Sequence, residues 1–155
     1  MNPPVPTVEK TTPVRPVPRR ETPTVPTEET MSRAVRQTGA LWAGITLLAL
    51  VGDQAHLSLD VSHVYPDKVD AHVGVAGRMD DPVAVRDAGK LAELRAVAGL
   101  LGRPLAVLHE YDDGGLSLQV TATVADHPVR VWAALVDPDV IRHARELIAG
   151  AAVDR

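Results

Sequence analysis

The side chains best suited to bind a metal or to move a proton are six histidines. The surrounding segments alternate apolar and polar residues, which predicts β-strands whose successive side chains face opposite ways. This alternation puts His63 and His109 on apolar strand faces, where either would be the polar group of a pocket. His72 falls on a polar face opposite Asp60, as a solvated cross-strand pair. Because these histidines do not converge, we expect no metal site and no bound cofactor.

Carboxylates offer the other candidate chemistry, and three acidic pairs occur. Each coincides with a predicted turn or helix start, where a short acidic side chain accepts hydrogen bonds from free backbone N–H groups: Asp80 with Asp81, Asp112 with Asp113, and Asp137 with Asp139. The chain has no cysteine, no glycine-rich phosphate loop and no nucleophile-elbow motif. The sequence therefore offers no catalytic residue and favours a protein that is not an enzyme.

One polar surface is left without a structural explanation. On the polar face of the predicted sheet, Trp132 is expected opposite Thr121, and Arg130 opposite Thr123, with Gln119 nearby. An exposed Trp beside an Arg is typical of protein interfaces. We therefore expect a contact surface that contains Trp132, Arg130, Thr121 and Gln119. The alternative is a third layer, formed by the first helix or the chain ends, that covers Trp132.

The periodicity predicts an α+β fold with the order α-β-β-α-β-β-β-α. Thr30 is expected to cap a helix over 31–51, and further helices open at Asp81-Pro82 and Asp137-Pro138. Five strands carry Val, Leu and Ala on one face. Hairpins with a single apolar face need helices on that face. We therefore predict a two-layer sandwich, with a mostly antiparallel five-stranded sheet and helices on one face.

Turn chemistry predicts the register of three hairpins and one helix face. The loops are expected at Tyr65 to Asp67, at Asp113-Gly114 and at Asp126-His127. The resulting partners are Val61 with Ala71, Tyr111 with Leu116, His109 with Leu118, and Val120 with Ala133. In the second helix, the pattern turns four charged side chains toward water: Arg86, Asp87, Lys90 and Glu93.

The first helix carries a wide stripe of large apolar side chains, which predicts heavy burial: Val35, Leu41, Trp42, Ile45, Leu48 and Leu50. Its most apolar stretch, 40–51, is shorter than the roughly twenty residues of a membrane span, so no span is expected. Met31, two arginines and this stretch also match the start of a signal peptide. A core helix is the favoured interpretation, and a secreted domain that starts at Met31 is the alternative.

Composition separates a tail from a domain. Residues 1–29 contain eight of the thirteen prolines and no large apolar side chain beyond Met1. They are predicted to form a disordered arm, and residues 30–155 a single α+β domain. The formal net charge of −4 argues against nucleic-acid binding.

Two short similarities stand out, one within the chain and one to other proteins. Leu57-Ser-Leu-Asp-Val61 returns as Leu116-Ser-Leu-Gln-Val120, which marks a candidate ββα repeat. Val64-Tyr-Pro-Asp-Lys-Val69 and the strand Val129 to Ala133, within residues 40–135, resemble small uncharacterised α+β proteins of actinobacteria and their mobile elements. The resemblance implies a bacterial origin, and it assigns neither an activity nor a catalytic residue.

These observations favour a cytoplasmic, non-enzymatic interaction or accessory protein that acts through its exposed sheet face. Its expected partner is another protein or a second copy of itself. Two alternatives stay open. One is a small-molecule-binding domain or minor enzyme, with a pocket between sheet and helices near His63 or His109. The other is the secreted domain.

Overall fold

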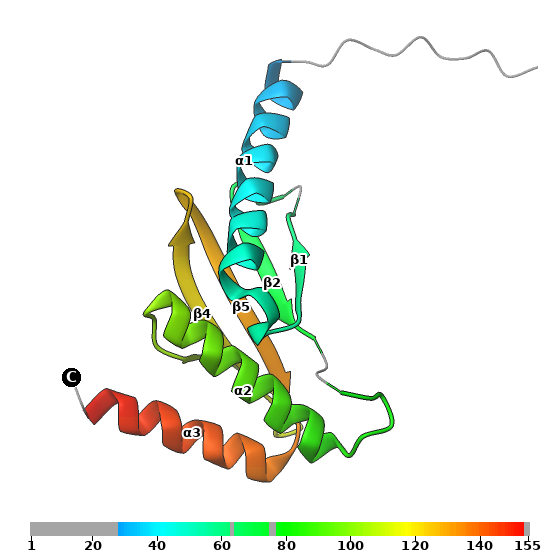
Figure 1. Ribbon diagram of the computed structural model, residues 1–155, viewed down its shortest axis with the longest axis vertical. Coiled ribbons are helices and arrows are strands. Elements are labelled where there is room, and N and C mark those ends of the chain that lie inside the picture. The colour runs from blue at the N-terminus through cyan, green and yellow to red at the C-terminus, as the bar shows by residue number, and fades with distance from the viewer. Residues whose placement is uncertain (1–27, 63, 75–76, 154–155) are drawn as a thin grey trace, which may run out of the picture.

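The structure is a computed structural model that describes residues 28–62, 64–74 and 77–153. It confirms the α+β class and the predicted order of elements (Figure 1). The predicted arm over 1–29 lies outside the described residues apart from Glu28 and Glu29, and so does His63. The elements are α1 (Glu28–Val51), the 3-10 turn η1 (Gly52–Gln54), β1 (Leu57–Asp60), β2 (Val69–Val73), α2 (Val83–Leu101), β3 (Ala106–Glu110), β4 (Leu116–Val124), β5 (His127–Leu135) and α3 (Pro138–Val153).

The sheet has the strand order β1-β2-β5-β4-β3, and it is mixed. β2 and β5 run parallel, whereas the other three neighbouring pairs are antiparallel. The expectation of a mostly antiparallel sheet came from local hairpins, which say nothing about how the hairpins join. Because α2 carries the chain across the sheet after β2, the last strand of the following meander returns beside β2 in the same direction.

The apolar strand face is buried as predicted, and α1 and α2 lie across it while α3 packs beside α2 (Figure 1). From the sheet, the fully buried side chains include Val69, Ala71, Val73, Leu116, Leu118, Val120, Val131 and Ala133. From α2, Leu94 and Val97 complete the layer, and Ile141 and Ala144 anchor α3. Alternation alone therefore identified the core face of β1, β2, β4 and β5 correctly, whereas no residue of β3 is buried.

The first hairpin is shifted by two residues from its predicted register. Leu59, and not Val61, lies opposite Ala71, and His72 lies opposite Ser58 rather than Asp60. The shift arises because β1 ends at Asp60, so the loop before β2 is longer than the predicted three residues. A two-residue shift preserves the face of every side chain.

The third hairpin shows a shift of the same size. Its two-residue turn is Ala125-Asp126, with positive φ angles of 47° and 65°, as a type I′ turn requires. The predicted turn at Asp126-His127 is therefore wrong, and Val120 pairs with Val131.

The second hairpin changes the face of a candidate residue. Tyr111 exchanges hydrogen bonds with Gly115 and Gly114, so the loop has three residues instead of the predicted Asp113-Gly114 pair. Because the loop is one residue longer than predicted, Glu110 pairs with Leu116 and His109 with Ser117, where His109 is exposed. The prediction that His109 faces the core opposite Leu118 is therefore wrong, since a one-residue slip moves a side chain to the other face. A β-bulge between His109 and Val107 shifts the register once more and pairs Val107 with Leu118.

The predicted burial of the large apolar side chains of α1 is wrong. The six large side chains of the predicted stripe are between 41% and 70% exposed. The face that meets the sheet is formed by smaller residues: Gly39, Ala40, Ala43 and Gly44, with Leu47 and Val51 below them. The helix also starts at Glu28, so Thr30 lies within it and is not its N-cap.

Of the caps predicted for the other two helices, one is confirmed and one is wrong. Asp137 accepts hydrogen bonds from the N–H groups of Asp139 and Val140 and caps α3 as predicted. Asp81 does not cap α2, because its carboxylate binds the N–H of Arg78 and Pro82 occupies the cap position.

The two segments of the candidate repeat, β1-β2-α2 and β4-β5-α3, each form a hairpin followed by a helix. Since β2 and β5 run parallel and both helices lie on one side of the sheet, no two-fold axis relates the segments. The duplication stays a prediction.

Candidate interaction surfaces

The outer face of the sheet, opposite the helices, brings together the four residues predicted to form a contact surface. Trp132 lies between His72 on β2 and Gln119 on β4, so its predicted partner Thr121 is wrong. The centroids of the Trp132 and His72 rings are 4.5 Å apart, with the rings tilted by 60°. Trp132, Gln119 and Arg130 are half-buried and Thr121 is exposed. Helices α1 and α2 lie on the other side of the sheet, so the first helix does not cover Trp132 (Figure 1).

The two cations of this face, Arg130 and Lys68, share one carboxylate. Arg130 lies opposite Thr121 rather than Thr123, and its Nε donates to an Asp70 oxygen at 2.6 Å. The Nζ of Lys68 is 3.6 Å from the same oxygen. The outer face therefore presents the Trp132 ring and hydroxyl or amide groups rather than an unpaired cation.

The imidazole of His72 adds a flat polar ring to this surface. Burial lowers the pKa of His72 below its ordinary value of 6.5, and the positive charge of Lys90 lowers it further. The ring is therefore uncharged at neutral pH. Across residues 28–62, 64–74 and 77–153, no three His, Asp or Glu side chains are placed to hold a metal ion.

His109 does not line a pocket between sheet and helices. Its ring meets that of Tyr111 edge-on, with centroids 4.6 Å apart, and the Tyr111 hydroxyl lies 3.1 Å from the Ser117 hydroxyl. These contacts lie at the β3–β4 end of the outer face. Since His63 is outside the described residues, the structure gives the small-molecule alternative no polar group of the kind predicted.

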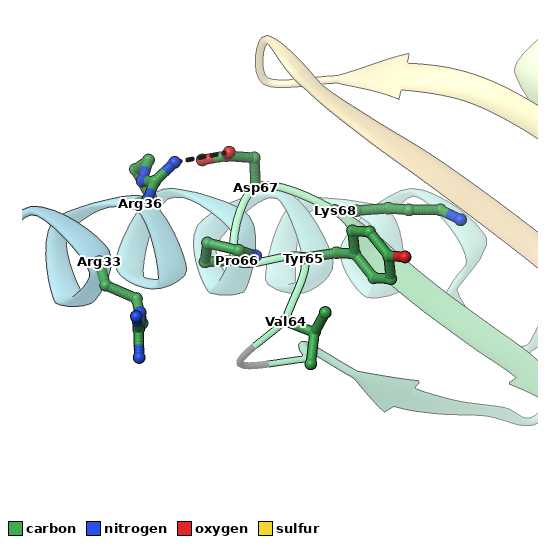
Figure 2. Close-up of a pocket in the computed structure, with 7 residues that line it drawn as sticks. All are labelled: Arg33, Arg36, Val64, Tyr65, Pro66, Asp67 and Lys68. Atoms are coloured by element: carbon green, nitrogen blue, oxygen red, sulfur yellow. Dashed lines mark hydrogen bonds and ion pairs between the residues drawn. The ribbon is translucent and has the colours of Figure 1, made fainter.

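A cavity of about 510 Å³ separates the first turns of α1 from the β1–β2 loop (Figure 2). Its lining includes three cationic side chains: Arg33, Arg36 and Lys68. Arg36 pairs with Asp67 at 3.4 Å, and Figure 2 shows Arg33 and Lys68 pointing away from that pair in different directions. Because the charges do not converge, the cavity lacks the geometry of an anion site.

Six of the large apolar side chains that α1 exposes define its outer face: Met31, Val35, Leu41, Trp42, Ile45 and Leu48. These side chains are between 41% and 70% exposed. No charged residue occurs on the helix between Arg36 and its end at Val51. The sequence did contain the signal, since α1 has an apolar stripe of large residues and another of mainly small ones. Only the structure shows that the small ones face the sheet.

The docking of α1 on the sheet depends on close approach. A Cβ atom at Gly39 would meet the His127 ring at 2.5 Å, and one at Gly44 would meet Leu59 at 3.0 Å. The His127 ring is itself held by a 3.1 Å contact between its Nδ1 and the Asp67 carbonyl. Larger residues on this face would hold the helix away from the strands.

Of the described helices, one is long and apolar enough to cross a membrane, the stretch Met31–Gln54. Core helices and signal sequences near an N-terminus meet the same criteria. Here Ala40, Ala43 and Leu47 are fully buried. Moving α1 into a bilayer, or removing it as a signal peptide, would uncover the sheet beneath it.

No protein-family model, curated protein or solved structure matches the chain. The actinobacterial resemblance therefore stays a prediction.

Proposed function

We propose that this chain is an interaction or accessory protein and that its main contact surface is the outer face of α1. One observation carries the proposal: a helix that is docked on the sheet along one side leaves six large apolar side chains in water along the other. The surface of a monomeric domain rarely carries such a stripe without a binding partner.

The size of the stripe supports this interpretation. The exposed fractions of its six side chains correspond to roughly 700 Å² of surface. The largest apolar patch of a typical monomer is about 300–600 Å², and larger patches usually mark protein or membrane contacts. A partner that covers the stripe removes this area from water, which is the main driving force of association.

The outer sheet face is the second proposed contact surface. The supporting observation is the Trp132–His72 pair, which none of the described helices covers. Its polar surroundings resemble the composition of a transient interface.

Photo-crosslinking from α1 tests the proposal. The chain has no cysteine, so Ala49→Cys introduces the only thiol, on an exposed position beside the outer face. A benzophenone maleimide attached there in the full chain should give a protein adduct on irradiation in extracts of the native host. Arg142→Cys, on the exposed side of α3, is the matched control and should give little adduct. Equal labelling from both positions, or lipid adducts alone from position 49, would contradict the proposal.

A further inference from the structure

We infer that the partner of α1 is a second copy of this chain, with the two α1 helices paired along their outer faces. This inference rests on the proposed function and specifies its partner. It follows from the spacing, area, charge and accessibility of the helix face.

The exposed positions follow the spacing of a two-helix coiled coil. From Met31 to Leu48, six of these exposed positions recur at intervals of three and four and are called the seam here: Met31, Ala34, Thr38, Leu41, Ile45 and Leu48. This interval repeats every seven residues and keeps one seam on a single side of the helix. Ile45 and Leu48 then occupy the a and d positions, the combination that favours two-stranded coiled coils.

The seam is separate from the residues that hold α1 on the sheet. Ala40, Ala43, Leu47 and Val51 are buried in the core, and none of them belongs to the repeat. A second helix can therefore cover the seam without displacing α1. Figure 1 shows the first turns of α1 extending beyond the strands, which leaves room for a second helix beside them.

The polar groups in the seam do not oppose burial. The Thr38 hydroxyl donates to the Ala34 carbonyl at 2.9 Å, and the neighbouring Thr46 hydroxyl donates to the Trp42 carbonyl at 2.9 Å. Both donors are satisfied inside the helix, so covering them with apolar surface leaves no unpaired donor. The stretch from Gln37 to Gly52 has no charge, so two copies meet along this part of the seam without like-charge repulsion.

The area agrees with a stable homodimer. Two outer faces of roughly 700 Å² each would bury at most about 1,400 Å² in total, which reaches the range of about 1,200–2,000 Å² for specific interfaces. The surface is also self-complementary, as a two-fold interface requires. The chain therefore supplies both halves of a contact of normal size.

Light scattering coupled to size exclusion tests this inference on the full chain. The wild type should elute with twice the mass of one chain, and Ile45→Asp should elute with the mass of one. Val85→Asp places the same charge on an equally exposed α2 position and should keep the dimer. Circular dichroism should show that both variants keep the helix and strand content of the wild type. Leu41→Asp provides a second seam variant if Ile45→Asp loses its fold.

The outcomes separate this inference from the proposed function. A photo-adduct at position 49 with twice the chain mass supports both. A wild type that is monomeric at every concentration, with an adduct to a different protein, overturns the homodimer and leaves the proposed function intact. A monomer that instead co-sediments with phosphatidylglycerol vesicles, and loses this binding in Ile45→Asp, overturns both.

Discussion

At the scale of single residues, Asp87 shows how a charge holds this fold together. Sequence periodicity turned it toward water, but its carboxylate is buried. It accepts the N–H groups of Val136 at 2.6 Å and Asp137 at 2.9 Å, and the Lys90 ammonium at 2.9 Å. Lys90 also donates to the Ala134 carbonyl at 3.0 Å. Asp87 thus joins α2 to the end of β5 and to the start of α3.

These contacts predict that Asp87→Asn lowers the free energy of unfolding by an amount that depends on pH. Burial acts to raise the pKa of Asp87, but the two backbone donors and Lys90 outweigh it and bring the pKa below its ordinary value of 3.8. Folding therefore favours the ionised carboxylate. Its contribution is complete above pH 3.8 and is lost as the pH falls toward the lower pKa of the folded state.

Urea titrations at pH 7 and near pH 3 measure this effect. At pH 7, Asp87→Asn should lower the free energy of unfolding by about 2–3 kcal/mol, as for buried hydrogen bonds to a charged group. The difference from the wild type should shrink near pH 3. Asp139→Asn, at an exposed carboxylate, should change little. An equal loss of unfolding free energy for Asp87→Asn at both pH values would contradict the stabilising role of the ionised carboxylate.

At the scale of elements, α1 approaches the sheet closely because small residues such as Gly39 and Gly44 face the strands. Gly39 lies under the His127 ring, whereas Gly99 in the last turn of α2 has open space around its Cβ position. Replacing Gly by Ala in a helix stabilises it by about 1 kcal/mol where nothing obstructs the methyl group. Overpacking a contact costs about 1–3 kcal/mol.

The matched pair Gly39→Ala and Gly99→Ala should therefore change stability in opposite directions. Gly99→Ala should raise the melting temperature, and Gly39→Ala should lower it because the His127 ring is fixed by the Asp67 carbonyl. Thermal unfolding by circular dichroism measures both. A stabilising Gly39→Ala would show that α1 does not approach β5 as closely as described.

For the strands, the sequence predicts which face is buried but not the register of their pairing. Alternation places Val69, Val120 and Val131 on the core face, because a two-residue slip leaves parity unchanged. The register was not predictable. Alternative strand ends and turn types, which shift the pairing by one or two residues, differ too little in free energy for a single sequence to distinguish them. At the β3–β4 loop, Asp113-Gly114 suits a two-residue turn as well as a three-residue loop that ends at Gly114, and this one residue decides the face of His109. For α1, hydrophobicity alone could not decide which of two apolar stripes meets the sheet.

At the scale of the whole molecule, the two candidate surfaces lie on opposite sides. Pairing through α1 leaves the outer sheet face, with Trp132 and His72, open on each copy. Of the four residues predicted for that face, all four lie on it, although their cross-strand partners differ from those expected. The sequence does not identify the α1 surface. A stripe of large apolar residues on a helix normally marks its buried side, and in α1 the smaller residues Ala40 and Ala43 are buried instead.

The two tryptophans report on the two surfaces separately, since Trp42 lies on the outer face of α1 and Trp132 on the sheet. The most direct measurement is the fluorescence of Trp42 alone, in Trp132→Phe, over a dilution series, with Trp42→Phe as the control that reports Trp132. Trp42 emission should shift to longer wavelength and become more open to acrylamide quenching on dilution, while Trp132 emission stays constant. Adding Ile45→Asp should expose Trp42 at every concentration. A Trp42 that is solvent-exposed at high concentration in the wild type, or shielded in the Ile45→Asp background, would contradict the account.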